Sequence, residues 1–258
     1  MFSATLDDAT ALKKALAVAG ELVDDGNFVA TAAGVSFQAL DSSHICVVDL
    51  NLPSECFSDL VVDETTVFGV HLGTLNRALG CSTAGKTVRI ATDAGAGAGA
   101  GDALTLDFDA ATFRVRLLDI DSDRVDIPAT ESTLTIDADS VAFQKIVKDL
   151  AAFGDVVTIR ADHTTGGNTT VTMSTTGEHG TATVRVDADV TCTSTFQAEF
   201  ATRFLATFAK AAGVCGRVRL ETSPDMPLFV TYALGQALGQ AEKGSLRFVL
   251  APKFPEPV

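Results

Sequence analysis

The chain has 258 residues, of which 47% are hydrophobic and 20% charged, and its net charge is −14. This composition is typical of a globular protein with one large domain or two of ordinary size. No apolar run approaches the roughly 20 residues of a membrane helix, and residues 1–8 lack a basic segment followed by an apolar one. We therefore expect neither a membrane anchor nor a secretory signal. The acidic total argues against simple nucleic-acid binding, which usually leaves a basic surface.

Cysteine and histidine usage gives no sign of a metal site. The five cysteines form no Cys-x-x-Cys pair, and the four histidines are scattered along the chain. A structural zinc ion would have no ligand set, and unpaired cysteines favour a reducing, intracellular compartment. We expect no metal, no cofactor and no catalytic residue.

In chain order, a helical period is confined to four segments, residues 9–22, 72–81, 140–153 and 202–212. The stretches between them are rich in Val, Thr, Ile and Phe and are separated by turn residues, which is typical of short strands. Strands are predicted at residues 29–40, 45–52, 88–92, 104–108, 156–161 and 217–221.

The helices come as two pairs, and the pairs repeat. A shift of 131 residues aligns 8–16 with 139–147, and a shift of 130 aligns 88–90 with 218–220. Asp8 and Asp139 open the two aligned helices, and we predict both as N-caps. The repeat predicts a duplicated α+β domain, residues 1–116 and 135–258, joined by a connector over 117–134. Coincidence in a simple residue alphabet is the alternative.

Two segments have no element of their own. Residues 117–131 are acidic, lack a period and contain a proline near their end, which indicates an extended connector. Residues 94–101 alternate Gly and Ala and have no side chains with which to pack. We interpret them as a mobile hairpin tip.

Positive charge is concentrated on the helices. The four helical segments hold seven cations against only Glu21 and Asp149, a sum of about +5, so the rest of the chain carries about −19. On each helix the cations point away from the apolar face. Four helices with a basic face would suit a surface that follows a phosphate backbone. The alternative is that these lysines and arginines only solvate exposed helix faces.

Two motifs point to chemistry that their context does not support. Residues 80–87 fit the phosphate-binding pattern G-x-x-x-x-G-K-[ST], but a predicted helix precedes them and a strand follows, the reverse of the order that this loop needs. Asp119-x-Asp121-x-Asp123 begins like a calcium loop, but Arg124 stands where glycine is required and Thr130 where a glutamate is required.

Several short motifs resemble the proliferating cell nuclear antigen family, in the family's order and over the whole chain. They are Met1-Phe2-x-Ala4, Leu12-Lys13-Lys14, Gln38-Ala39-Leu40-Asp41-Ser42-Ser43-His44, Leu117-Leu118-Asp119-Ile120-Asp121, Ile127-Pro128, Pro227-Leu228 and Leu250-Ala251-Pro252-Lys253. The resemblance implies a DNA sliding clamp, which tethers polymerases and repair proteins to duplex DNA and has no catalytic activity. It implies two similar domains per subunit and three subunits in a closed pseudo-sixfold ring, with helices lining the hole and antiparallel sheets outside. It also implies a nuclear location.

The resemblance assigns roles to particular residues. DNA would face Lys13, Lys14, Arg77, Lys145, Lys148, Arg203 and Lys210. The subunit interface would pair the strand that holds Phe113, Val115 and Leu117 with the next subunit's strand that holds Ala182, Val184 and Val186. Polymerases, a clamp loader and repair proteins would dock short peptides with an apolar and aromatic plug on Leu40, His44, Ile45, Val47, Val125, Ile127, Pro128, Pro227, Val249, Ala251 and Pro252. Each of the last two sets could equally be ordinary strand or core.

The chain departs from the family at several positions. Gly20 and Gly80 stand where relatives often have lysine, Val249 where an aromatic residue is common, and His163 where the family's ubiquitin and SUMO acceptor lysine lies. Two other hypotheses remain: a subunit of a checkpoint-type heterotrimeric clamp, and a nucleotide-dependent enzyme that uses residues 80–87.

Overall fold

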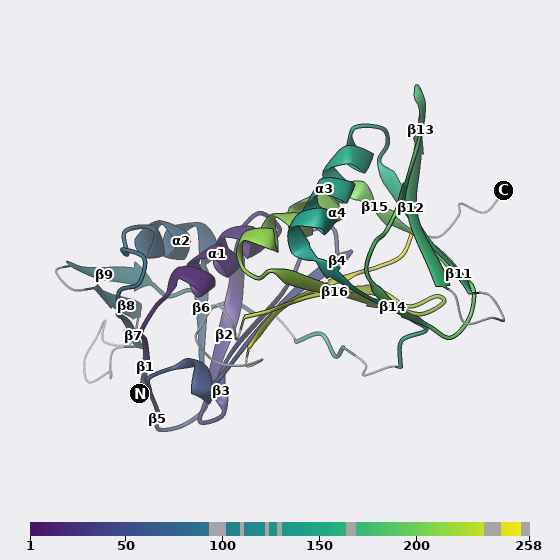
Figure 1. Cartoon of the computed structure of the whole chain (residues 1–258). Helices are drawn as coiled ribbons and strands as arrows, with labels where there is room; N and C mark the ends of the chain where they lie inside the picture. Colours follow the sequence, from purple (N-terminus) through teal and green to yellow (C-terminus); the bar gives the residue numbers. More distant parts are fainter. Residues whose placement is uncertain are drawn as a thin grey trace. The chain divides into compact units, whose positions relative to one another are not determined.

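The computed structural model describes residues 1–92, 102–108, 111–121, 124–127, 131–163, 169–234 and 244–253. The chain divides into two compact units, residues 1–125 with 233–246 and residues 126–232 with 247–258. Each unit contains antiparallel strands and a pair of neighbouring helices (Figure 1). The finer division predicted from the sequence, 1–116, 117–134 and 135–258, stays a prediction.

The first unit has two sets of paired strands. One follows the order β5 (Asp59–Val62), β1 (Phe2–Leu6), β7 (Val88–Thr92), β8 (Ala103–Phe108) and β9 (Ala111–Arg116). The other follows β4 (Cys46–Pro53), β3 (Gly34–Leu40), β2 (Asp25–Thr31) and β6 (Thr66–His71), with the short helix η1 (Ser54–Cys56) after β4. Helices α1 (Thr10–Ala19) and α2 (Leu72–Gly80) pack against each other.

The second unit repeats this arrangement. Its five-strand set is β14 (Asp189–Cys192), β10 (Leu134–Asp139), β16 (Arg217–Thr222), β17 (Leu228–Ala233) and β18 (Ser245–Leu250). Its four-strand set is β13 (Gly180–Arg185), β12 (Thr169–Gly177), β11 (Val156–His163) and β15 (Phe196–Ala201). Helix α3 (Ser140–Ala151) packs on α4 (Thr202–Phe208) and on η2 (Ala209–Gly213).

The duplication predicted from the sequence is therefore confirmed. The two strand orders match one to one in chain order, and α1 and α2 correspond to α3 and α4. The offset of about 130 residues between the helix starts is the one found in the sequence.

The helices begin and end at residues that differ slightly from those predicted from the sequence. Helix α1 stops at Ala19, and the last predicted segment is an α-helix only to Phe208, after which the chain tightens into η2. Asp139 is the N-cap of α3 and accepts a hydrogen bond from Ala142 N at 2.8 Å. The matching prediction for Asp8 was wrong by one residue, because Ala9 is the N-cap and Asp8 accepts from Thr10 N instead, at 2.8 Å.

The single strand predicted over residues 29–40 was also wrong. It is a hairpin of β2 and β3, in which Thr31 pairs with Gly34 across the turn. Gly34 has φ of 144°, and a Cβ there would lie 2.2 Å from Leu52 O. Ala32 and Ala33, between the two paired residues, give no turn signal of their own, so the turn depends on Gly34 and was missed.

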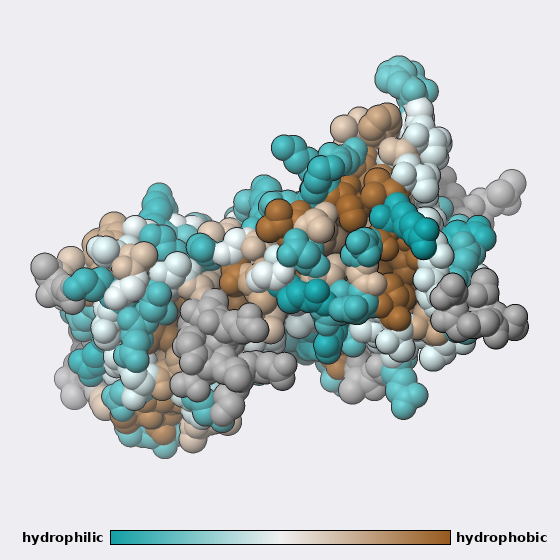
Figure 2. All heavy atoms as spheres, viewed as in Figure 1, coloured by the Kyte–Doolittle hydropathy of each residue, from teal (hydrophilic) through white to brown (hydrophobic). Residues whose placement is uncertain are grey.

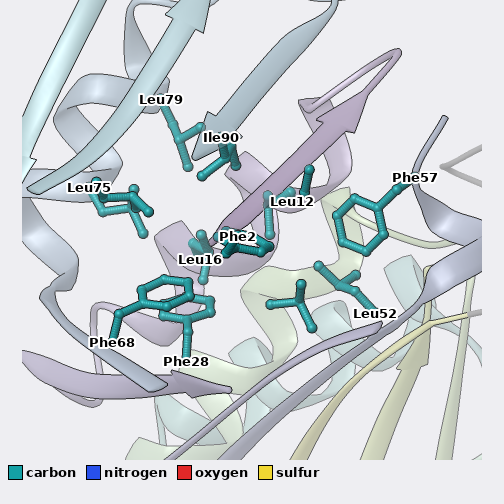
Figure 3. Close-up of a pocket in the computed structure, with 13 residues that line it drawn as sticks. Phe2, Leu12, Leu16, Phe28, Leu52, Phe57, Phe68, Leu75, Leu79 and Ile90 are labelled. Carbon is teal, nitrogen blue, oxygen red and sulfur yellow. The ribbon is translucent and has the colours of Figure 1, made fainter. Parts of the chain in front are cut away.

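An apolar cavity of about 30 Å³ lies in the core of the first unit. Side chains from α1, α2 and several strands surround it, among them Leu12, Phe28 and Phe68 (Figure 3). The rings of Phe28 and Phe68 stack with centroids 5.5 Å apart. In the second unit, Phe208 stacks on Phe248 at 4.5 Å, so an aromatic pair fills part of that core.

In the second unit, apolar side chains reach the surface between α3 and the strands β12 and β14 (Figure 2). A small pocket of about 10 Å³ in the same unit is lined by Phe143 and Ile146 of α3 and by Met173 of β12, and Phe143 and Met173 are buried. No helix in the described part of the chain is long and apolar enough to cross a membrane.

Candidate nucleic-acid interface and assembly edges

The helices present the cations that the sequence singled out. Lys14, Arg77, Lys145, Lys148, Arg203 and Lys210 are exposed, and Lys13 is half-buried. On α1, Leu12 and Leu16 are buried on the opposite face, which explains why the lysines between them point away from the core.

Two of these cations contact helix carbonyls in the first unit. Lys13 Nζ donates to Gly80 O at 3.0 Å, and Arg77 Nε donates to Gly73 O at 3.2 Å. Gly80 is the last residue of α2, where the helix dipole and the terminal carbonyls attract a cation. Lys13 therefore links α1 to the end of α2 and keeps positive charge at that point.

In the second unit the cations make weak surface contacts. Lys145 Nζ lies 2.9 Å from Asp149 Oδ2, and the hydrogen bond to this carboxylate raises the pKa of Lys145. The guanidinium of Arg203 lies 4.7 Å from the ring centre of Phe204. An exposed ion pair contributes little to stability, so these side chains can change partner at small cost.

His71 is a helix-capping residue that the sequence analysis missed. It is the N-cap of α2, and its Nδ1 accepts from Thr74 N at 3.1 Å. Its position directly before an apolar helical period was the available signal, but histidine is not among the usual N-cap residues. His71 fixes the start of the helix that carries Arg77.

The two strands expected at the subunit interface are both sheet edges. Among the described strands, β9 pairs only with β8, and β13 pairs only with β12. Both alternate between more and less exposed residues: Phe113 is half-buried and Val115 buried on β9, and Ala182 and Val184 are half-buried on β13. Leu117 and Val186, which follow the two strands, are half-buried too. Each edge thus offers unpaired backbone groups and an apolar row.

The residues expected to bind peptides are divided between the units. In the first, Leu40, His44, Ile45 and Val125 are exposed and Val47 is buried. In the second, Ile127, Pro227 and Pro252 are half-buried, Val249 is buried and Ala251 is exposed. Pro128 lies outside the described residues.

The loop that carries His44 is organised by one carboxylate. Asp41, 5% exposed, accepts from Ile45 N at 2.7 Å, Cys46 N at 2.6 Å, and both the backbone N–H and the hydroxyl of Ser43. His44 has φ of 58°, a left-handed conformation that histidine tolerates better than most residues. The loop therefore holds His44 and Ile45 toward solvent.

The described residues contain no metal-binding group of three or more His, Cys, Asp or Glu side chains, and all five cysteines are free thiols. The loop over residues 81–87 follows helix α2 and precedes strand β7, the order expected from the sequence. The calcium-like and Gly/Ala segments fall partly or wholly outside the described residues, although β7 and β8 on either side of residues 94–101 pair antiparallel.

Comparison with known proteins identifies relatives along the whole chain. The family model for the proliferating cell nuclear antigen N-terminal domain matches residues 1–127, and that for the C-terminal domain matches residues 126–253. A probable DNA polymerase sliding clamp 2 of Paramecium bursaria Chlorella virus 1 is 32% identical over 256 residues, 98% of this chain and 91% of the relative. Proliferating cell nuclear antigen 2 of Drosophila melanogaster is 28% identical over 270 residues, 100% of this chain and 99% of the relative.

Proposed function

The chain belongs to the proliferating cell nuclear antigen family and is a DNA sliding clamp, and we propose that three copies close head to tail into a ring around duplex DNA. Members of this family are scaffolds without catalytic activity. The observation that carries the proposal is a pair of edge strands, each hydrogen-bonded to another described strand on one side only: β9 in one unit and β13 in the other. A head-to-tail contact joins two different surfaces, and copies joined in this way form a ring when the rotation closes.

The charge distribution supports the same assembly. Seven cations lie on or directly after the four helices of a chain with net charge −14. In a ring lined by these helices, the cations would contact phosphates without reading sequence. Closure of the ring, not tight binding, would keep the clamp on DNA, so a few weak contacts suffice.

The alternation of the edge strands supports one register. Side chains of paired residues lie on the same face, so the covered residues of β9 must meet those of β13. An antiparallel pairing that places Phe113 opposite Val184 and Val115 opposite Ala182 does this. The same pairing sets Arg114 opposite Thr183. A slip of two residues in one direction would set Arg114 opposite Arg185 and bring like charges together. A slip in the other direction would set Val115 opposite Gly180, which has no side chain to pack against it.

Partner proteins would bind through short peptides. The exposed apolar residues Leu40, Ile45 and Val125 on the first unit support such a site. We propose that polymerases, a clamp loader and repair proteins place an apolar and aromatic plug there, and that the protein acts in the nucleus.

The test of assembly is the solution mass, by size-exclusion chromatography with light scattering. A mass three times that of the 26.8 kDa chain, unchanged on dilution, is expected. A monomer that assembles only with other clamp chains would favour a checkpoint-type heterotrimer instead.

The register has its own test, in a Cys81→Ser background that removes the exposed thiol. The double variant Val115→Cys with Ala182→Cys is expected to form covalent oligomers on oxidation, because directly opposed residues lie within disulfide range. Val115→Cys with Val184→Cys is the matched control and should cross-link poorly. Equal cross-linking of both pairs would contradict the register.

A further inference from the structure

Four neighbouring strands of the first unit all contact the connector. In the register of the sheet, Gly69 of β6 is opposite Asn27 of β2, Asn27 is opposite Gln38 of β3, and Gln38 is opposite Asp49 of β4. We call these four residues the anchoring row. Because opposed residues project to the same face, the row forms one line across the sheet.

The connector residues 118–121 and 124–125, which we call the strap, follow this line. Leu118 N donates to Gly69 O at 2.9 Å, the two residues forming an antiparallel bridge. At the other end, Val125 N donates to Gln38 Oε1 at 2.7 Å. The strap therefore crosses the face from β6 to β3 and β4, all within the first unit.

The inner contacts of the row are equally specific. Asn27 Nδ2 donates to Ile120 O at 2.9 Å. A Cβ at Gly69 would lie 2.5 Å from Leu118 O, so only glycine allows the strap to approach β6 this closely.

Arg124 fastens the end of the strap. Its Nη1 donates to Ser36 Oγ at 3.2 Å, and its Nη2 lies 3.9 Å from Asp49 Oδ1. The side chain of Asp49 is only 10% exposed, so this charge is largely covered and faces a cation.

From this geometry we infer that the amides of Asn27 and Gln38 are positioning residues, which fix the strap on the sheet and thereby set the place of Val125 in the peptide site. The positioning role rests on the proposed peptide docking, whereas the fixing of the strap does not. All four strands contribute contacts, and the two amides act in opposite senses: Asn27 donates to a strap carbonyl, and Gln38 accepts from a strap N–H.

Because Asn27 donates its hydrogen bond and Gln38 accepts one, replacing each amide by a carboxylate should have opposite effects on the strap. Asn27→Asp removes the donor and sets a carboxylate against Ile120 O. Gln38→Glu keeps the acceptor for Val125 N, and Gln38→Met removes it. We expect hydrogen exchange of the strap amides, followed by NMR on the full-length protein, to quicken roughly tenfold in Asn27→Asp and Gln38→Met and to stay within about twofold in Gln38→Glu.

Two controls accompany these variants. Gln197→Glu makes the same kind of change, amide to carboxylate, at an exposed position of β15 in the second unit and should leave the strap unchanged. The Leu118 amide, held by the Gly69 backbone, should stay protected in the Gln38 variants. Equal exchange in Asn27→Asp and Gln38→Glu, or a loosened strap in Gln197→Glu, would overturn the inference.

The second readout is the affinity of a synthetic peptide with an apolar and aromatic plug, measured by fluorescence anisotropy. Weaker binding in Asn27→Asp and Gln38→Met, but not in Gln38→Glu, is expected. If the strap loosens and the affinity is unchanged, the positioning role is wrong. If the unmodified protein binds no peptide, the proposed docking fails, while hydrogen exchange still decides whether the amides hold the strap.

Discussion

At the scale of single residues, Asp41 shows how one side chain can define a surface loop. Burial raises the pKa of its carboxyl, but the hydrogen bonds from Ser43, Cys46 and Ile45 outweigh burial and hold the pKa below its ordinary value. A carboxylate that accepts several hydrogen bonds cannot be replaced by an amide without leaving some of the donors unpaired.

We therefore expect Asp41→Asn to lower the free energy of unfolding by about 1–3 kcal/mol at neutral pH. Because the folded-state pKa is depressed, the stabilisation by Asp41 is present above about pH 4 and is lost as the pH falls through the lower, folded-state pKa. The stability difference between the original protein and Asp41→Asn should thus shrink on acidification, as measured by urea unfolding at several pH values. Asp59→Asn, an exposed change on β5, is the control, and a difference independent of pH would contradict this account.

The lysines of α1 show which contacts can be predicted from the sequence and which cannot. The pattern predicts that Lys13 and Lys14 point away from the apolar face of α1, and they do. It could not predict that Lys13 reaches Gly80 O, because that contact joins residues 67 positions apart. The anchoring row was missed for the same reason: Asn27, Gln38 and Asp49 become one line only through the register of the sheet.

At the scale of elements, the helical period and the internal repeat were sufficient to predict helices α1 to α4 and the duplication. The strands were predicted less accurately, since the turn between β2 and β3 contains no proline, asparagine or aspartate and depends on Gly34 alone. The edge strands β9 and β13 were expected from the resemblance, but an alternating strand can be internal or an edge. Which of the two it is depends on pairing with distant segments.

The repeat also explains a difference between the two cores. Leu12 of α1 aligns with Phe143 of α3, and both side chains are buried. Leu12 borders the apolar cavity of about 30 Å³ (Figure 3), whereas Phe143 supplies a larger ring at the equivalent place in the second unit. The cavity beside Leu12 is therefore larger than the one beside Phe143, about 30 Å³ against about 10 Å³.

Leu12→Phe should fill this space. At about 24 cal/mol per Å³ of cavity, the gain in unfolding free energy is at most about 0.7 kcal/mol. The mirror change, Phe143→Leu, should destabilise the second unit by a comparable or larger amount. Calorimetry at one fixed protein concentration can measure both, because assembly makes the midpoint depend on concentration. A lower midpoint for Leu12→Phe would mean that the walls cannot move enough to accept a ring.

At the scale of the whole molecule, the outstanding feature is the contrast between basic helices and an acidic remainder. Gly20 and Gly80 add no charge to the helical face of the first unit, at positions where the sequence analysis expects lysine in relatives. The two glycines differ in surroundings: a Cβ at Gly20 would lie 2.8 Å from Asn76 Nδ2, which donates to Leu16 O, whereas a Cβ at Gly80 would meet no atom within 4 Å. Only Gly80 can be given a side chain without disturbing a contact between the helices.

We therefore expect Gly80→Lys to be tolerated and to strengthen binding of duplex DNA at low salt. If the new lysine contacts a phosphate, the plot of log binding constant against log salt concentration should become steeper by about 0.9. Gly80→Gln, of similar length and no charge, is the matched control for the added side chain. Anisotropy of a labelled duplex between low and moderate salt gives both slopes. Identical slopes for the two variants would mean that the end of α2 does not face DNA, and the assignment of Lys13 and Arg77 to the DNA-facing surface would then fail with it.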